Sequence, residues 1–317
     1  MKNKHIVILN ESIHDDGLEL LKKQCQVFIE ADLGFKSGNL ANADGLILRA
    51  SGCLESTHLD YATNLKVVGR YGVGVDNIDT RACSVREIPI VYTPKSNSRS
   101  VAELVVAQMM AIFRNTFAQD SAVRSGAWEI RNVAAGSELS GKSLGLIGLG
   151  NIGLEVAKIA TLGLEMSCSY FDLRRNETAE KELGLTFLSL EEVLASSDVV
   201  SMHVPLLPST RQMISFRELA LMRHGAVLIN MARGGLVNEK ALIEFLASGS
   251  LRGAALDVFE SEPLENGNPF MTQKNILLTP HSGALTEEAS QRTSVAVASD
   301  VLAVLNGETA INVYNRG

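Results

Sequence analysis

One stretch of sequence decides the fold: Lys142-Ser143-Leu144-Gly145-Leu146-Ile147-Gly148-Leu149-Gly150-Asn151-Ile152-Gly153. Its first half is an apolar run of β-strand length, and its second half has the glycine spacing GxGxxG. An amphipathic helical pattern over residues 154–162 follows and is expected to stop at Gly163. Small residues between a strand and a helix let backbone N–H groups approach a pyrophosphate closely. The stretch therefore predicts a dinucleotide-binding turn, although a generic strand-to-helix turn has the same spacing.

An acidic residue follows the next expected strand, residues 167–171. Asp172 comes about 20 residues after the turn, where dinucleotide-binding folds place a carboxylate against the adenosine ribose. Such a carboxylate binds both ribose hydroxyls and repels a 2′-phosphate, so the sequence predicts NAD. Two alternatives remain: Asp172 caps a loop, or the nearby Arg174 and Arg175 hold the 2′-phosphate of NADP.

The rest of the chain alternates strands and helices in the same way. Its 317 residues, 46% hydrophobic and 21% charged, suit two globular domains. Short apolar runs separated by helical patterns predict an α/β fold with two Rossmann-like or flavodoxin-like parallel-sheet domains and a cleft between them. The expected strands are residues 6–9, 27–29, 45–48, 67–69 and 90–92 in the first series, and 142–147, 167–171, 199–203, 226–229, 253–258 and 276–278 in the second.

Two long helices are expected outside this alternation. After a break at residues 93–98, Ser100 and Glu103 have the spacing of a capping box, which predicts a helix from Ser100 to about residue 114. This helix is apolar on most of its circumference, so we expect it to be buried between domains or against another subunit. A final helix over residues 286–305 should end at Gly307 in the left-handed conformation.

Charge and cysteine content narrow the class of protein. The formal net charge of −7 does not favour nucleic acid or an anionic membrane as a partner. Four cysteines without metal-ligand spacing are expected to be buried, reduced thiols, and no metal site is predicted. The first apolar run is too short for a signal peptide, and residues 104–113 are too short to span a bilayer, so we expect a cytoplasmic protein.

Three expected strands of the second series end in residues with useful chemistry. Arg233 follows strand 226–229, Asp257 and Glu262 follow the next strand, and His281 follows strand 276–278. Ligands bind at the carboxyl ends of parallel strands. A guanidinium grips a carboxylate, a histidine delivers a proton to a carbonyl oxygen, and a carboxylate stabilises the imidazolium. The set therefore predicts reduction of a 2-oxo acid by hydride transfer.

Each member of this set also has an ordinary structural explanation. Arg233 suits a surface helix terminus, Glu262 an exposed turn before a proline, and His281 a hydrogen-bonded core histidine. Their joint occurrence behind a dinucleotide turn favours the catalytic interpretation. The remaining histidines have no comparable setting and are expected to be structural or exposed: His5, His14, His58, His203 and His224.

These motifs together resemble the D-isomer-specific 2-hydroxyacid dehydrogenases, and most closely their 3-phosphoglycerate dehydrogenase branch. The resemblance covers nearly the whole chain. Its motifs are residues 69–79, 98–104, 148–153, 203–206, 232–235, 257–259 and 279–281.

The resemblance implies a role for each matching residue. It implies a catalytic trio of Arg233, Glu262 and His281, with His281 as the acid/base. It implies NAD contacts, one of them by Asp257 near the nicotinamide amide, and a substrate carboxylate held by the backbone of Val73 and Gly74. The implied cofactor-binding set is Gly148, Gly150, Asn151, Ile152, Gly153, Asp172, Met231, Ala232 and Asp257.

The resemblance also implies how the chain is organised. A discontinuous substrate-binding domain would comprise residues 1–97 and 285–317, and the NAD-binding domain residues 98–284. The family usually forms dimers on the helix corresponding to residues 100–114, with Trp128 similar to an aromatic interface anchor, so a homodimer or a dimer of dimers is expected.

Two departures from the phosphoglycerate dehydrogenase branch bear on the substrate. Where that branch often has paired basic residues, residues 48–52 retain only Arg49, a candidate substrate contact. The sequence also ends soon after Gly307, so we expect no appended regulatory domain. The substrate is therefore expected to be a small D-2-hydroxy acid, with 3-phosphoglycerate as one candidate. The alternatives are a hydroxypyruvate, glyoxylate or sulfonated 2-oxo acid reductase, and a non-catalytic NAD(H)-sensing partner protein. Glu262 argues against a formate dehydrogenase, which typically has glutamine there.

Overall fold

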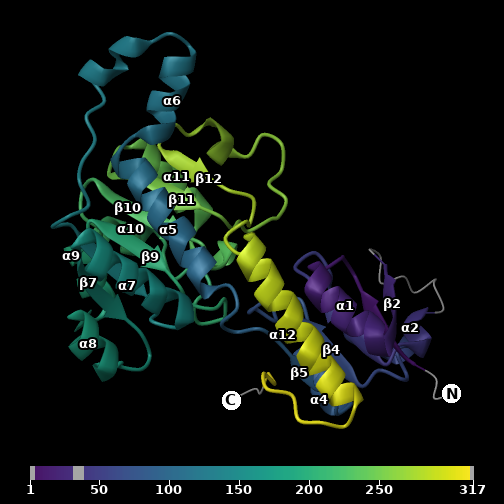
Figure 1. Cartoon of the computed structure of the whole chain (residues 1–317). Helices are drawn as coiled ribbons and strands as arrows, with labels where there is room; N and C mark the ends of the chain where they lie inside the picture. The colour runs from purple at the N-terminus through teal and green to yellow at the C-terminus, as the bar shows by residue number, and fades with distance from the viewer. Residues whose placement is uncertain (1–3, 31–38, 315–317) are drawn as a thin grey trace. The chain divides into compact units, whose positions relative to one another are not determined.

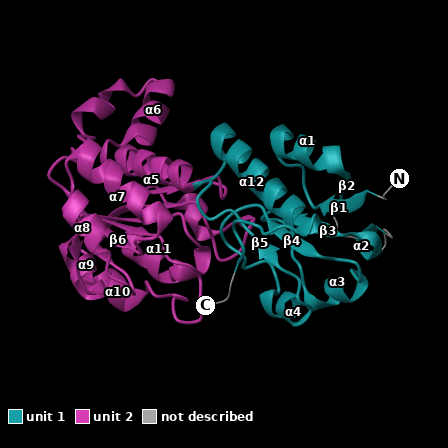
Figure 2. Ribbon diagram, turned by 60° about the horizontal axis from the view of Figure 1, so that its bottom comes forward, with its two compact units in different colours: residues 1–97, 284–317 teal, residues 98–283 magenta. Residues whose placement is uncertain are grey.

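The computed structural model describes residues 4–30 and 39–314. The chain divides into two compact units, residues 1–97 with 284–317 (unit 1) and residues 98–283 (unit 2), coloured separately in Figure 2. Within the described residues, each unit contains one parallel sheet, of five strands in unit 1 and seven in unit 2, so the α/β fold class predicted from the sequence is confirmed.

Unit 1 is a parallel sheet covered by helices on both faces. The strand order is β2-β1-β3-β4-β5. Successive side chains of a strand point to opposite faces, so Ile8 packs beneath one layer of helices and Val7 beneath the other. Helices α1 and α12 cover the Val7 face, and α2, α3 and α4 cover the Ile8 face. The elements are β1 (His5–Leu9), α1 (Asp15–Gln24), β2 (Cys25–Ile29), α2 (Asn39–Asn42), β3 (Gly45–Leu48), α3 (Ser56–Tyr61), β4 (Val67–Arg70), α4 (Thr80–Val85), β5 (Ile90–Val91) and α12 (Glu287–Leu305).

Unit 2 is a larger sheet of the same kind, with strand order β12-β11-β10-β9-β6-β7-β8. The order reverses between β6 and β9, which creates the switch point where open α/β sheets bind ligands. Its elements are α5 (Ser98–Phe113), α6 (Thr116–Arg124), η1 (Trp128–Asn132), β6 (Ser143–Ile147), α7 (Asn151–Leu164), β7 (Ser167–Phe171), α8 (Glu177–Leu183), β8 (Thr186–Phe187), α9 (Leu190–Ser196), β9 (Val199–Met202), α10 (Phe216–Leu221), β10 (Ala226–Asn230), η2 (Gly234–Leu236), α11 (Glu239–Ala247), β11 (Leu251–Leu256), η3 (Pro269–Thr272) and β12 (Ile276–Leu278).

Every predicted strand is present, with ends that differ by at most two residues. The two-residue strand β8 was not predicted, because Thr186 and Phe187 are too short a run to show an alternating pattern. The final helix agrees with its prediction, since Thr286 caps its start and Gly307 follows its end with φ 77°.

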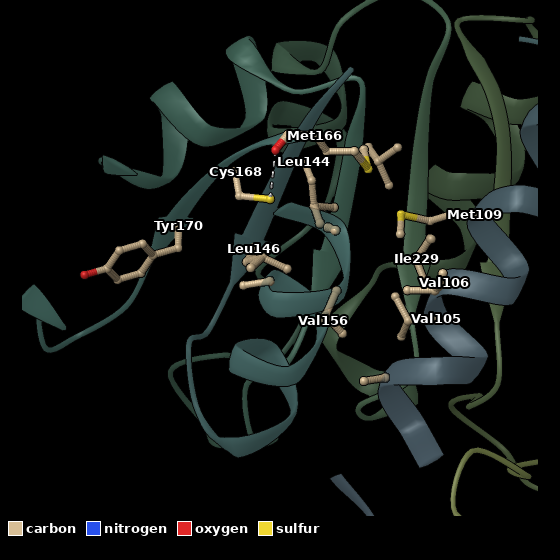
Figure 3. Packing of buried hydrophobic residues seen from close by; sticks show 14 of the residues in the cluster. Val105, Val106, Met109, Leu144, Leu146, Val156, Met166, Cys168, Tyr170 and Ile229 are labelled. Atoms are coloured by element: carbon tan, nitrogen blue, oxygen red, sulfur yellow. Dashed lines mark hydrogen bonds between the residues drawn. The ribbon is translucent and has the colours of Figure 1, made fainter. Parts of the chain in front are cut away.

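The predicted capping box at the start of α5 is wrong. The helix begins at Ser98, so Ser100 lies within its first turn, and the Glu103 carboxylate accepts instead from Arg99 Nε at 2.6 Å. The expected burial of this helix is found inside unit 2 itself. In Figure 3, Val105 and Met109 of α5 point toward the sheet residue Ile229 and pack in one cluster with it. Neither another domain nor another subunit is needed to bury this face.

The helix after the glycine-rich turn is longer than predicted. Helix α7 begins at Asn151, directly after Gly150, and runs through Gly163 to Leu164. The left-handed residue that ends it is Glu165, with φ 54°. Gly163 is compatible with a helical backbone, so a glycine alone did not mark the end.

The cysteine prediction holds for three of the four thiols. Cys25, Cys83 and Cys168 are buried and unpaired, whereas Cys53 is exposed because it lies in the turn between β3 and α3. Burial raises the pKa of Cys83 to about 11 and that of Cys168 to about 12, so these two thiols stay protonated and unreactive.

Among the described residues, no single helix is long and apolar enough to cross a bilayer. Only α5 and α6 taken together, with a bend of 63° between them, reach that length and composition.

Candidate active site

Backbone atoms leave no room for a side chain at two glycines of the glycine-rich turn. Gly148 has φ 96°, and a Cβ there would lie 2.7 Å from the carbonyl oxygen of His203. A Cβ on Gly153 would lie 2.3 Å from the carbonyl oxygen of Gly148. A Cβ on Gly150, in contrast, would meet nothing within 4 Å. The two glycines that close the turn are therefore required by packing, and Gly150 keeps open space in front of the N-terminus of α7, as a pyrophosphate needs.

A pocket of about 510 Å³ adjoins this turn, and Asp172 is part of its lining. Asp172 Oδ2 accepts from the Leu149 N–H at 2.8 Å, and Oδ1 accepts from the Arg174 N–H at 3.1 Å. The two bonds hold the carboxylate beside the turn, where a ribose diol would hydrogen-bond to it. The residues of the turn and this pocket thus fit an adenine dinucleotide.

The strand ends beside the turn include a half-buried histidine. His203 follows β9, and its Nε2 lies 2.9 Å from Ser201 Oγ. Burial lowers the pKa of His203 to about 3, so the ring is neutral at physiological pH. Its backbone N–H donates to Ile147 O at 2.7 Å, which ties the loop after β9 to the glycine-rich turn. The expectation that His203 is structural agrees with this setting.

The Glu262 and His281 side chains meet at the other half of the sheet. His281 Nδ1 lies 2.7 Å from Glu262 Oε2, and Glu262 Oε1 accepts from the Phe259 N–H at 3.0 Å. Burial raises the pKa of Glu262, but the bonds from His281 and Phe259 and the charges of His281 and Arg233 outweigh it and keep that pKa below its ordinary value. Glu262 is therefore an anion at neutral pH, and it can orient the imidazole and stabilise its protonated form.

Arg233 is held in the loop that follows β10. Asn230 Nδ2 donates to Arg233 O at 2.7 Å, and Asn230 Oδ1 accepts from the Ala232 N–H at 3.0 Å. The next residue, Gly234, approaches the chain so closely that a Cβ there would lie 1.9 Å from the carbonyl carbon of Phe259. This contact brings the loop of Arg233 against the loop that leads to Glu262. Sequence reasoning missed Asn230, although a polar residue that ends a buried strand was a usable signal.

Asp257 organises the loop that carries His281. Its Oδ1 accepts from Thr279 Oγ1 at 2.6 Å and from the Ser282 N–H at 2.8 Å, and its Oδ2 accepts from the Gly283 N–H at 2.8 Å. Its own carbonyl accepts from the His281 N–H at 2.8 Å, and His281 has the left-handed φ of 51°. Asp257 is only 1% exposed, so these bonds give it a clear role in holding the loop. Thr279 was not predicted, because its role depends on this contact between two loops.

A second pocket, of about 310 Å³, lies beside the pair and is mainly apolar. Glu262 and His281 form part of its lining, together with Phe259, Pro263, Leu264, Leu278, Thr279 and Pro280. The Glu262 and His281 side chains are 36% and 41% exposed, so the pair is open to this pocket and to solvent.

The predicted substrate contacts belong to unit 1. Val73 and Gly74 are half-buried in the turn after β4, where Arg70 Nε donates to Gly74 O at 2.6 Å. Arg49 Nη1 donates to Ser12 O at 2.7 Å, and its guanidinium stacks over the Tyr71 ring at 5.0 Å.

Unit 2 therefore places the glycine-rich turn and Asp172 after β6 and β7, at one half of its sheet. The other expected cofactor residues follow β10 and β11 in the other half, where the expected trio also lies. Met231 is buried at the end of β10, next to the half-buried Ala232, and Asn151 and Ile152 open α7. The fold and the turn define a protein that binds an adenine dinucleotide on a parallel α/β sheet.

Comparison with known proteins specifies the class further. The NAD-binding domain model of the D-isomer specific 2-hydroxyacid dehydrogenases matches residues 106–283. The chain belongs to this family, and its cofactor is NAD.

Individual relatives differ in the substrate named. D-3-phosphoglycerate dehydrogenase of Methanocaldococcus jannaschii is 38% identical over 98% of this chain, which spans 59% of that protein's length. Glyoxylate reductase of Thermococcus litoralis is 35% identical over 98% of this chain and 96% of its own length. Among solved structures, the TT0316 protein from Thermus thermophilus has a TM-score of 0.90 at 34% identity, covering 98% of this chain and all of its own. D-lactate dehydrogenase from Aquifex aeolicus, complexed with NAD and lactic acid, has a TM-score of 0.87 at 26% identity, with 96% of each chain covered.

Proposed function

We propose that this protein is an NAD-dependent oxidoreductase that interconverts a small D-2-hydroxy acid and its 2-oxo acid. The observation that carries the proposal is the 2.7 Å contact between His281 Nδ1 and Glu262 Oε2, formed in the same unit as the dinucleotide turn. A histidine held by an anionic carboxylate is the acid/base that reduction of a carbonyl requires.

The roles of the residues follow from their contacts. When bound, NADH supplies the hydride that reduces the carbonyl carbon. With Nδ1 held by Glu262, His281 exchanges a proton with the substrate oxygen through Nε2. The ionised Glu262 stabilises the imidazolium before the proton leaves. In the oxidation direction the same nitrogen accepts the hydroxyl proton.

We propose that Arg233 binds the substrate carboxylate. Its guanidinium offers a planar fork of donors that matches a carboxylate, and its backbone is held by Asn230. In unit 1, we propose that the backbone N–H groups of Val73 and Gly74 are donors to a substrate anion, as glycine-containing turns are. Arg233→Lys tests this role, because a lysine keeps the charge but loses the fork, and KM for the 2-oxo acid should rise at least tenfold.

The surroundings of Arg49 favour a substrate without a phosphate. Arg49 Nε lies 3.6 Å from Glu11 Oε2, and Nη1 already donates to Ser12 O. The nearby carboxylate offsets the positive charge that a phosphate would need. We therefore propose glyoxylate or hydroxypyruvate as the first substrates to test. Phosphohydroxypyruvate is the second candidate, because a relative 38% identical is named D-3-phosphoglycerate dehydrogenase.

Oxidation of NADH, followed by its loss of absorbance, tests the proposal against glyoxylate, hydroxypyruvate, phosphohydroxypyruvate and sulfopyruvate. Turnover of one or more 2-oxo acids supports it, and the preferred substrate shows whether the site around Arg49 accepts a phosphate. Tight NADH binding without turnover of any of them would overturn it in favour of an NAD(H)-sensing protein.

We also propose that the protein is a homodimer. Helix α6 has no buried residue and, with η1, projects from the body of unit 2 (Figure 1), exposing Phe117, Val123 and Trp128 by 59%, 51% and 61%. Apolar side chains gathered on an arm without a core of its own are typical of an interface between subunits. Light scattering after gel filtration should give twice the chain mass, and Phe117→Ser with Trp128→Ser should give the monomer. A monomeric native protein would contradict the proposal.

A further inference from the structure

In the segment that follows Asp172, the guanidinium of Arg175 forms hydrogen bonds with the carboxylate of Glu180. Arg175 Nε lies 2.9 Å from Glu180 Oε1 and 3.1 Å from Oε2, and Arg175 Nη2 lies 2.7 Å from Oε2. This fork-to-carboxylate geometry is the strongest form of an arginine–carboxylate pair. The bonds from Glu180 raise the pKa of Arg175, and the bonds from Arg175 and Tyr170 lower the pKa of Glu180, so both groups are charged at neutral pH.

A third residue fixes the position of the Glu180 carboxylate. The Tyr170 hydroxyl donates to Glu180 Oε1 at 2.8 Å and accepts from the Asn176 N–H at 2.7 Å. Tyr170 is fully buried in β7, where its ring packs against Phe187. Tyr170 therefore anchors the Glu180 carboxylate to the sheet, and this carboxylate in turn holds the Arg175 guanidinium in place.

These residues lie beside the expected position of the adenosine ribose, whose 2′-hydroxyl in NAD is replaced by a 2′-phosphate in NADP. Asp172, Arg174 and Arg175 all line the pocket of about 510 Å³ beside the glycine-rich turn, and of the two arginines Arg175 is the one whose guanidinium is paired with Glu180. A 2′-phosphate at this position needs an arginine, whereas a 2′-hydroxyl needs a carboxylate. To bind a phosphate, Arg175 would have to leave its three close contacts with Glu180.

We propose that Glu180, anchored by Tyr170, determines the preference for NAD by withholding Arg175 from the 2′-phosphate of NADP. The inference rests on the dinucleotide site of the proposed function and adds a specificity residue that does not touch the cofactor. Glu180 acts through Arg175, whereas Asp172 acts on the ribose directly.

The test measures Kd for NADH and NADPH by titration of nicotinamide fluorescence. In Glu180→Gln the released Arg175 should tighten NADPH binding about tenfold, while Kd for NADH stays within about twofold. Arg175→Ala alone should change neither Kd by more than about twofold, because the native arginine is already engaged. In the double variant Glu180→Gln/Arg175→Ala the gain for NADPH should disappear.

Glu182→Gln is the matched control, because it removes one negative charge from the same helix outside the lining of the pocket. A similar gain for NADPH in this variant would assign the effect to net charge and overturn the proposal. Unchanged NADPH binding in Glu180→Gln, or a gain that survives Arg175→Ala, would also overturn it. Failure of the native protein to bind NADH would overturn the dinucleotide site itself, which is a separate outcome.

Discussion

His281 Nδ1 and Glu262 Oε2 lie 2.7 Å apart, although 19 residues separate them along the chain. The contact forms because the two loops follow neighbouring strands, with Leu256 of β11 opposite Leu278 of β12. The side chains are 41% and 36% exposed, so solvent screens the pair and its contribution to stability is small. The pair instead orients the imidazole, and the effect of losing that orientation would be seen in the rate of catalysis.

Replacement of His281 by alanine should separate chemistry from cofactor binding. Turnover of the preferred 2-oxo acid should fall by about 10²- to 10⁴-fold, because the proton donor is lost. Kd for NADH should stay within about twofold, since the glycine-rich turn is unaltered. His224→Ala, at an exposed position outside the site, should keep the native rate. A native rate in His281→Ala would remove this residue from the mechanism.

The role of Asp257 is tested by asparagine, which keeps the size of the side chain but replaces one acceptor oxygen with a donor. Two loop N–H groups and Thr279 Oγ1 donate to the native carboxylate, so the variant loop should lose its alignment. We expect kcat to fall about 10- to 100-fold, with Kd for NADH nearly unchanged. An equal weakening of NADH binding would instead assign Asp257 to the nicotinamide contact implied by the family resemblance.

Asp172→Ala should narrow the preference for NADH over NADPH. The variant loses a charged acceptor for the ribose hydroxyls and the repulsion of a 2′-phosphate, so the ratio of the two Kd values should change about tenfold. The same fluorescence titration measures both constants. An unchanged ratio would mean that the arginines after Asp172, rather than its carboxylate, decide the preference.

Two glycines of α7 offer a matched pair of alanine substitutions. A Cβ on Gly153 would meet the Gly148 carbonyl oxygen at 2.3 Å, so Gly153→Ala should lower the free energy of unfolding by about 1–3 kcal/mol and weaken NADH binding. A Cβ on Gly163 would meet nothing within 4 Å, so Gly163→Ala should raise stability by about 0.5–1 kcal/mol. Urea unfolding measures both, and similar effects of the two substitutions would refute the steric argument.

His203 should make the protein less stable in acid. Its pKa of about 3 lies below the ordinary value of 6.5, so between these pH values the unfolded chain binds a proton that the folded chain does not. The free energy of unfolding should therefore decrease as pH falls from 6.5 toward 3, by up to about 2 kcal/mol at pH 5.

His203→Gln should show a shallower pH dependence of urea unfolding than the native protein between pH 7 and pH 5. His224→Gln, at an exposed position, serves as the control and should keep the native slope. Identical slopes for His203→Gln and the native protein would contradict the burial argument.

The sequence by itself determined the local features of this fold. Strands such as Gly45–Leu48 and Ser167–Phe171 were predicted with their observed ends, because a short apolar run bounded by polar residues is typical of a buried β-strand. The turn at Gly148 and Gly153 was also predictable, since close backbone approach admits only glycine. Arg233, Glu262 and His281 could be proposed because each directly follows a recognisable strand.

Tertiary structure alone decided how these side chains meet. The sequence did not show that Asp257 binds the loop of His281, that Asn230 holds the backbone of Arg233, or that Glu180 engages Arg175. It also misplaced the start of α5, where the capping pattern of Ser100 and Glu103 suggested a later residue. The physical reason is common to the three contacts: hydrogen bonds made by polar side chains in these segments depend on loop positions set by the packing of the whole sheet, which the local sequence pattern does not specify.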